Sequence, residues 1–283
     1  MKVTYIQTQL HWEDREKNLS HFDTLINSIK EETQLILLPE MFTTGFSMHP
    51  KKTAEPANGI TLKWMQQKAK EKNAVICGSV AVKDRENYFN RLFWVMPNGE
   101  FHTYNKRHLF SMGKENEHFK AGAKKLIAQL GEWKVCPLVC YDLRFPVWSR
   151  NKFKSKVKSQ KHALSAAEGS AVSSQQSAEG AWDYDVLIYV ANWPEARVYP
   201  WKQLLIARAI ENQCYVIGVN RIGKDGNGIS HAGESLVIDP KGTIVSKANY
   251  NQECVETIAL DKLALDEFRT TFPVGRDADE FSV

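Results

Sequence analysis

Long hydrophobic runs are missing from this sequence of 283 residues. No stretch approaches the roughly 20 apolar residues that a helix needs to cross a bilayer, so a membrane-spanning protein is not expected. Cysteine is also sparse: the five cysteines form an odd set without a Cys-x-x-Cys pair, which argues against a disulfide framework and against a zinc site. Reduced thiols are typical of cytosolic proteins, and we expect a cytoplasmic location.

The sequence also has little excess of charge of either sign. The formal net charge is +4, and most basic residues are interspersed among acidic ones, so a dedicated nucleic-acid surface is not predicted. The hydrophobic content of 43% is enough for a substantial core, in one large domain or in two smaller ones. Residues 1–9 alternate apolar and polar side chains, which predicts a strand and not a signal peptide.

Strands and helices are predicted to alternate along the chain. A strand at 2–9, a helical pattern between 19 and 29, and a strand at 34–38 make a β-α-β opening. An Asn98-Gly99 pair between apolar runs predicts a hairpin and therefore mixed sheets. Further helices are expected at 61–72 and 200–212, and further strands at 74–80, 89–96, 100–104, 185–192, 215–220, 235–238, 242–247 and 253–260. This pattern alone predicts an α/β or α+β protein.

Residues 151–181 differ from the rest in composition. The first part is rich in lysine, and residues 165–180 are mostly Ser, Ala, Glu, Gln and Gly. Such a composition buries too little apolar surface to offset the entropy of ordering. We therefore predict a flexible surface insertion at 151–181. A regulatory or partner-binding arm that uses the lysines is the alternative.

Cys140 ends the apolar run 135–139 and begins the turn-like segment 141–146. A buried strand that breaks sharply before a short helix leaves its last side chain at the edge of a sheet, among backbone N–H groups. A thiol in such a position can attack an acyl carbon. A packing cysteine is the alternative, because free cysteine is among the most buried residue types.

Two further polar residues also lie just after the ends of predicted strands. Glu40 follows the apolar run 34–38, and Lys106 follows a strand that ends near Tyr104. Strand ends and the loops after them are where layered α/β proteins build their sites. Taken alone, Glu40 also fits a helix start or a solvated position, and Lys106 also fits a basic surface cluster beside Arg107.

The segments around these three residues resemble the nitrilase superfamily of carbon-nitrogen hydrolases in order, spacing and content: 38–42, 104–110 and 138–146. The sequence outside these three segments is most similar to the bacterial omega-amidase (2-oxoglutaramate amidase) branch, notably at 43–46, 191–194 and 207–213. The resemblance covers nearly the whole chain except the insertion. It implies one domain over 1–283, a four-layer α-β-β-α sandwich with mixed sheets, and a homodimer.

The resemblance also implies a cysteine-dependent amidase. Cys140 is the expected nucleophile. Glu40 is its expected general base, with a preformed thiolate held by the neighbouring ammonium group as the alternative. Lys106 and the backbone N–H of Tyr141 are expected to stabilise the oxyanion.

A second glutamate lies between the lysine and cysteine motifs in many members of the superfamily. Glu115 and Glu117 are the candidates here, and the spacing to Gly122 favours Glu115. Its expected role is to position substrate or water and to steady Lys106, and a solvated loop acid is the alternative. We interpret His108 as structural, because the expected chemistry already has its base.

For the substrate, the resemblance implies a small α-keto acid amide such as 2-oxoglutaramate or 2-oxosuccinamate, whose carboxylate needs a cationic or donor-rich partner. Arg144 is a candidate for that partner, and pairing with Asp142 is the alternative. Asn192, Trp193 and Trp201 are candidates for shaping the pocket, with a core or dimer-surface role as the alternative for each.

The rival functions are hydrolysis of a nitrile, an N-carbamoyl compound or another small amide within the same superfamily, and a noncatalytic binding protein on the same fold. The joint presence of Glu40, Lys106 and Cys140 favours an enzyme. A redox sensor is disfavoured, because Cys136 lies in the same predicted strand as Cys140 and no resolving partner is obvious. No cofactor or metal is expected, and the expected partner is a small-molecule amide.

Overall fold

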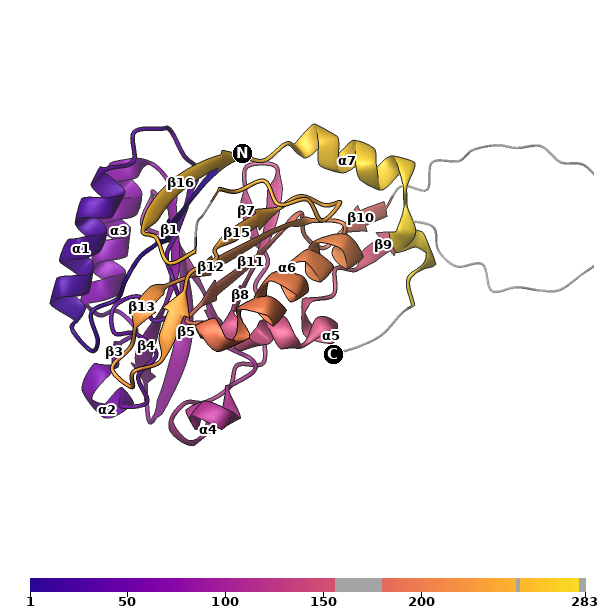
Figure 1. The fold of residues 1–283 in the computed structure, drawn as a ribbon. Coiled ribbons are helices and arrows are strands. Elements are labelled where there is room, and N and C mark those ends of the chain that lie inside the picture. Colours follow the sequence, from indigo (N-terminus) through magenta and orange to yellow (C-terminus); the bar gives the residue numbers. More distant parts are fainter. Residues whose placement is uncertain (156–179, 248–249, 280–283) are drawn as a thin grey trace, which may run out of the picture.

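Two β-sheets packed face to face form the centre of the protein (Figure 1). The computed structural model describes residues 1–155, 180–247 and 250–279. The first sheet contains, in spatial order, β16 (Cys254–Ala259), β1 (Lys2–Gln7), β2 (Leu35–Leu37), β4 (Val75–Asp84), β5 (Asn87–Val95) and β6 (Phe101–Asn105), with β3 (Glu55–Pro56) paired to β4. The second sheet contains β15 (Leu236–Ile238), β12 (Tyr215–Asn220), β11 (Val186–Ala191), β8 (Trp133–Val139) and β7 (Ala128–Leu130).

Both sheets combine parallel and antiparallel pairs. In the first sheet β2 lies parallel between β1 and β4, whereas β5 and β6 continue as antiparallel neighbours. In the second sheet β11 lies parallel between β8 and β12, and β7 and β15 add antiparallel edges. Gly99 turns the β5–β6 hairpin with a φ of 87°, a conformation that favours glycine. The predicted mixed sheets are confirmed.

Side-chain alternation along β2 shows how the layers are stacked. Leu35 and Leu37 pack into the core between the two sheets, whereas Ile36 and Leu38 pack in the core beneath helices on the outer face. The alternation follows from strand geometry, because successive side chains point to opposite faces. A strand covered on both faces reads as a continuous apolar run, and 35–38 is such a run.

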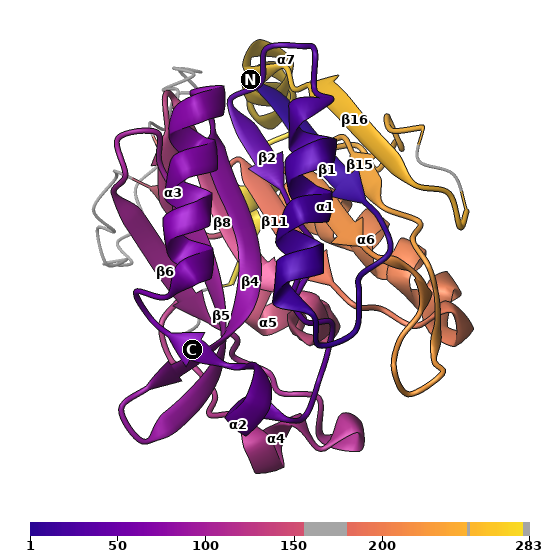
Figure 2. The same cartoon turned by 90° about the vertical axis from the view of Figure 1, so that its left-hand side faces the viewer.

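Helices cover both outer faces of the pair of sheets. α1 (Arg15–Asn27) and α3 (Ile60–Lys72) pack on the first sheet, and α6 (Val198–Asn212) packs on the second (Figure 1, Figure 2). α6 buries Trp201 and Leu205, one helical turn apart, against its sheet. The layers therefore follow the predicted order α-β-β-α.

The remaining elements are short. They are the helices α2 (Pro50–Thr53), α4 (Glu115–His118), α5 (Pro146–Ser149) and α7 (Lys262–Thr271), the 3₁₀ turns η1 (Ser111–Gly113), η2 (Cys140–Arg144), η3 (Glu195–Arg197) and η4 (Val274–Asp277), and the strand pairs β9 (Phe153–Ser155) with β10 (Gly180–Trp182) and β13 (Ile222–Lys224) with β14 (Ser230–Ala232). Within the described ranges, no helix is both long enough and apolar enough to span a membrane.

The strand predicted at 242–247 is wrong. The segment forms one isolated bridge, between Ile238 and Ile244. The preceding Asp239 side chain accepts hydrogen bonds from the N–H groups of Lys241 and Thr243 at 2.9 Å. Such local bonds compete with a ladder for the backbone, so a tight turn replaces the start of the strand.

The predicted insertion at 151–181 is described only at its two ends. β9 and β10 pair in antiparallel fashion there. Asn151 is 2% exposed and bonds to Tyr184 and Asn212. Both ends of the predicted range are therefore part of the folded structure, which corrects its bounds. Residues 156–179 lie outside the described residues, and the flexible insertion stays a prediction.

Candidate active site

The predicted site residues lie where strands of both sheets end. Glu40 follows β2, Lys106 follows β6 and Cys140 follows β8. β6 runs in the direction of β2, because two antiparallel pairings separate it from β4. The second sheet is joined to this edge by the N–H of Asn192, which follows β11 and donates to Glu40 Oε2 at 2.9 Å. Carboxyl ends of strands are the usual location of sites in layered α/β proteins.

Glu40 is held in a sharp turn after β2. The next residue, Met41, has a φ of 44°, a left-handed conformation that non-glycine residues seldom adopt. Its N–H donates to Ser79 Oγ of β4 at 2.9 Å. The turn packs so closely on β4 that a Cβ at Gly78 would lie 3.0 Å from Leu38 Cβ. As a result, the Glu40 side chain is fully buried between the sheets.

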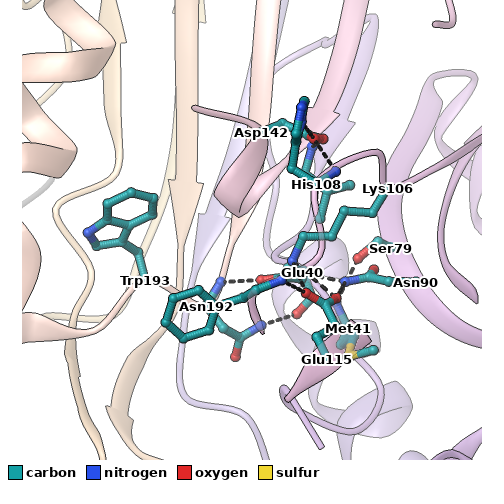
Figure 3. A network of polar contacts seen from close by, with 12 residues as sticks. Glu40, Met41, Ser79, Asn90, Lys106, His108, Glu115, Asp142, Asn192 and Trp193 are labelled. Atoms are coloured by element: carbon teal, nitrogen blue, oxygen red, sulfur yellow. Dashed lines mark hydrogen bonds and ion pairs between the residues drawn. The ribbon is translucent and has the colours of Figure 1, made fainter. Parts of the chain in front are cut away.

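Lys106 lies between two carboxylates (Figure 3). Its Nζ is 2.8 Å from Glu40 Oε1 and 2.9 Å from Glu115 Oε2, and all three side chains are fully buried. Asn90 of β5 donates from Nδ2 to the same two carboxylates, at 2.8 Å to Glu40 and 3.1 Å to Glu115. The ring centroid of Phe46 lies 5.1 Å from the ammonium nitrogen. These contacts fix the position of the positive charge.

The two glutamates considered for the loop after Lys106 differ in their surroundings. Glu115 begins α4 and binds Lys106, whereas Glu117 is exposed. The loop returns to β6 at Gly122, whose N–H donates to the Lys106 carbonyl oxygen at 2.9 Å. A Cβ at this glycine would lie 2.1 Å from the Asn105 carbonyl oxygen, so the close approach requires glycine.

Cys140 is the first residue of η2 and has a φ of 43°. A left-handed conformation at a non-glycine residue carries strain and occurs preferentially at functional sites. The side chain is 9% exposed. The charges of Glu40 and Lys106 both act on its thiol, and the three side chains line one cavity. The structure thus brings Cys140, Glu40 and Lys106 together.

Burial and charge set the protonation states in the site. Burial raises the pKa of the Cys140 thiol well above its usual range, and Glu40 raises this pKa further, although Lys106 lowers it. Burial alone lowers the pKa of Lys106, but the charges of Glu115 and Glu40 outweigh burial and raise it. Burial raises the pKa of Glu115 against the opposing effect of Lys106. A neutral thiol beside a firmly charged ammonium group is therefore favoured over a preformed thiolate.

Asp142 connects the cysteine turn to the loop that carries Lys106. Its Oδ2 accepts the Val139 N–H at 3.1 Å and the Tyr104 hydroxyl at 2.7 Å. Its Oδ1 accepts the backbone N–H of His108 at 3.0 Å and lies 2.8 Å from His108 Nδ1 (Figure 3). The His108 ring is stacked on Phe145 with centroids 3.8 Å apart. These contacts fit a structural role for His108.

We expect the Asp142→Asn variant to lose about 2–3 kcal/mol of unfolding free energy. The asparagine amide nitrogen would face N–H donors where a carboxylate oxygen now accepts them, so buried donors would lose their partner. Urea unfolding measures the loss. Asp266→Asn, at an exposed position on α7, is the matched control and should change stability by less than about 0.5 kcal/mol. Equal stability of the two variants would contradict the bridging role.

A cavity of about 410 Å³ is lined by Glu40, Lys106 and Cys140. This volume is in the range of small-molecule sites. Tyr141, the residue after the cysteine, also lines the cavity. Much of the remaining wall is apolar and is made by Phe46, Met48, Phe110, Phe145, Trp193 and Ile229. The arrangement suits a small substrate whose reacting group reaches the buried polar end.

Three of the four candidate substrate-binding residues line the cavity, and the fourth lies in the core. Arg144, Asn192 and Trp193 line the cavity. The suggested Arg144–Asp142 pair does not form, since Asp142 binds other partners and the Arg144 guanidinium lies 5.2 Å from the Trp193 ring centroid. Trp201 lies in the core, fully buried, with its ring 5.3 Å from that of Trp193.

Sequence reasoning missed Asn90, Phe110 and Arg197. Asn90 is 1% exposed in β5, and a polar residue at a strand position followed by an apolar run was the available signal. Phe110, which precedes η1, and Arg197, which ends η3, also line the cavity and carried no comparable signal. In the part of the chain that the structure describes, no group of three or more His, Cys, Asp or Glu side chains could hold a metal ion.

Comparisons with known proteins identify a family and several similar chains. A family model described as carbon-nitrogen hydrolase matches residues 2–156 and 178–269. The omega-amidase YafV of Escherichia coli (strain K12) is 42% identical, with 99% of this chain and 98% of that protein covered. The 2-oxoglutaramate amidase of Bacillus subtilis (strain 168) is 28% identical, with 97% and 96% covered. XC1258 of Xanthomonas campestris, a CN-hydrolase superfamily protein with an arsenic adduct in its active site, has a TM-score of 0.90 at 38% identity, with 100% and 98% covered.

Proposed function

The chain belongs to the carbon-nitrogen hydrolase family, within the nitrilase superfamily, and we propose that it is an omega-amidase that hydrolyses a small α-keto acid amide. The proposed substrate is 2-oxoglutaramate or 2-oxosuccinamate, and the products are the corresponding dicarboxylate and ammonia. The names of two relatives, an omega-amidase and a 2-oxoglutaramate amidase, support this substrate class.

One observation carries the catalytic part of the proposal. A thiol, a carboxylate and an ammonium group from three distant strand ends meet at the buried end of one cavity: Cys140, Glu40 and Lys106. Amide hydrolysis needs a nucleophile, a group that moves its proton and a positive site for the oxyanion. The three side chains supply one of each.

The first half-reaction forms a thioester. Cys140 Sγ attacks the amide carbon while its proton moves to the Glu40 carboxylate, which lines the same cavity. The amide oxygen gains the negative charge, which Lys106 Nζ and the backbone N–H of Tyr141 stabilise. Loss of one such donor typically costs about 3 kcal/mol of transition-state stabilisation. Glu40 then returns the proton to the amide nitrogen, the carbon–nitrogen bond breaks, and ammonia leaves.

The second half-reaction releases the acid. Glu40 accepts a proton from water as the water oxygen attacks the thioester carbon. The carbon–sulfur bond breaks, the proton passes from Glu40 to the sulfur, and the free thiol is restored. Glu115 binds the same ammonium group as Glu40, so its proposed role is to keep Lys106 in place through both steps.

A substrate panel tests this proposal. Ammonia release should show the highest kcat/KM with 2-oxoglutaramate or 2-oxosuccinamate, and lower values with glutamine, an N-carbamoyl amino acid and a nitrile. Faster turnover of the nitrile or the carbamoyl compound would reject the substrate class and keep the superfamily chemistry. Absence of ammonia from every compound would favour a noncatalytic binding protein.

A further inference from the structure

Two arginine side chains line the cavity without an acidic partner. Arg144 lies at the end of η2, and Arg197 ends η3 just before α6. Neither forms an ion pair with any residue in 1–155, 180–247 or 250–279. An arginine that lacks a carboxylate partner at the wall of a substrate cavity is available to bind an anion.

Aromatic rings hold both guanidinium groups in place. Arg144 lies 5.2 Å from the ring centroid of Trp193, and Arg197 lies 5.4 Å from that of Phe110. Trp193 also donates from Nε1 to the Arg197 carbonyl oxygen at 2.7 Å. Stacking on an aromatic face orients a guanidinium group before a ligand arrives, so less entropy is lost on binding.

The same contacts connect Arg197 to the reacting end of the cavity. The N–H of Phe110 donates to Glu115 Oε2 at 2.7 Å, and this oxygen lies 2.9 Å from Lys106 Nζ. Arg144 lies on the same 3₁₀ turn as Cys140, about 8 Å further along at about 2 Å per residue. Both guanidinium groups are therefore placed to reach the far end of a short molecule whose amide lies at Cys140.

The other acidic side chains at the cavity already have hydrogen-bond partners. Glu40 is paired with Lys106. The Asp225 carboxylate accepts the N–H groups of Asn227 and Ile229 within the β13–β14 hairpin, at 2.8 and 2.9 Å. Burial, together with the charge of Arg221, lowers the pKa of His231 to about 4, so this histidine is neutral near pH 7. Among the cavity-lining residues that the structure describes, the two arginines are thus the cations without an acidic partner.

We propose that Arg197, assisted by Arg144, binds the carboxylate at the end of the substrate distant from the amide, and thereby selects monoamides of dicarboxylic acids over neutral primary amides. This inference rests on the proposed amidase function and assigns its specificity-determining residue. A planar guanidinium matches a carboxylate in bidentate fashion, whereas a neutral chain end would leave the arginines without a partner.

The test compares two amides that differ only at that end, glutaramate with a carboxylate and pentanamide with a methyl group. The Arg197→Gln variant should lose about 10- to 100-fold in kcat/KM for glutaramate, mainly through KM, because a charge-assisted hydrogen-bonded pair is removed. Its kcat/KM for pentanamide should stay within about threefold. Arg197→Lys, which keeps the charge without the bidentate fork, should fall between wild type and Arg197→Gln.

Arg85→Gln is the matched control, since Arg85 is exposed in the β4–β5 turn. It should affect neither substrate. An equal loss on both amides in Arg197→Gln would mean a structural role and would overturn the assignment. Wild-type turnover that is no faster for glutaramate than for pentanamide would overturn the carboxylate selectivity while leaving the amidase function intact.

A binding measurement separates this inference from the catalytic proposal. Calorimetric titration with 2-oxoglutarate, the expected product, needs no turnover. Wild type should bind this dicarboxylate at least about tenfold more tightly than Arg197→Gln. Equal affinity would reject the arginine site even in an active amidase, whereas a difference in affinity without ammonia release from any amide would retain the site and reject the reaction.

Discussion

Replacing Cys140 with serine should lower kcat for ammonia release from 2-oxoglutaramate by about 10⁴-fold or more. Burial and the charge of Glu40 raise the pKa of the Cys140 thiol and so favour its neutral form. A serine hydroxyl is a much weaker acid than a thiol. Transfer of its proton to the Glu40 carboxylate is therefore less favourable than transfer of the thiol proton. A loss of this size corresponds to about 5.5 kcal/mol of transition-state stabilisation. A steady-state ammonia assay measures it.

Cys254→Ser is the matched control for this substitution. Cys254 is half-buried on the edge strand β16 and does not line the cavity, so activity should stay within about twofold of wild type. Melting temperatures of both variants show whether each is folded. If folded Cys140→Ser enzyme kept turnover within about tenfold of wild type, another group would have to be the nucleophile.

The second large effect is expected from Lys106→Met, which removes the positive charge between Glu40 and Glu115. Two buried carboxylates would then face each other without a counter-charge. Breaking a buried pair by removing one partner typically costs about 3–5 kcal/mol of unfolding free energy. Loss of the oxyanion donor should also lower kcat by about 10²- to 10³-fold. Urea unfolding and the ammonia assay measure the two effects separately.

The double variant Lys106→Met/Glu115→Gln distinguishes charge imbalance from lost packing. Neutralising Glu115 removes one of the two unpaired acids, so we expect it to recover at least about 1 kcal/mol of the lost stability, with no recovery of kcat. Lys17→Met is the control, because the exposed Lys17 side chain contacts a half-exposed acid on the surface, Asp14, and its loss should cost less than about 1 kcal/mol. Additive losses in the double variant would contradict the shared-charge account.

Much of the architecture was predictable because it depends on local patterns. The apolar run 35–38, the helical spacing in 61–72 and the Asn98-Gly99 turn each specify an element from neighbouring residues alone, and the structure has β2, α3 and the β5–β6 hairpin there. The strand expected at 242–247 failed for a local reason, the hydrogen bonds of Asp239. The homodimer, the cytoplasmic location and the flexible insertion stay predictions.

The contacts of the site were not predictable from the sequence in the same way. Glu40 and Lys106 are 66 residues apart, and Glu40 and Asn192 are 152 residues apart. Hydrogen bonds across such separations depend on which strands become neighbours. Asn90 illustrates this, because it reaches Lys106 through the pairing of β5 with β6.

By itself, the sequence determined which chemical groups follow the ends of the strands. Through the resemblance of three motifs, it also determined the superfamily. Tertiary structure alone decided that Glu115 is buried against Lys106 while Glu117 is exposed, that the Cys140 thiol is favoured in its neutral form, and that Arg144 lacks an acidic partner among the described residues. The physical reason is that desolvation and Coulomb interactions depend on distances in space, and the order of residues along the chain does not specify these distances.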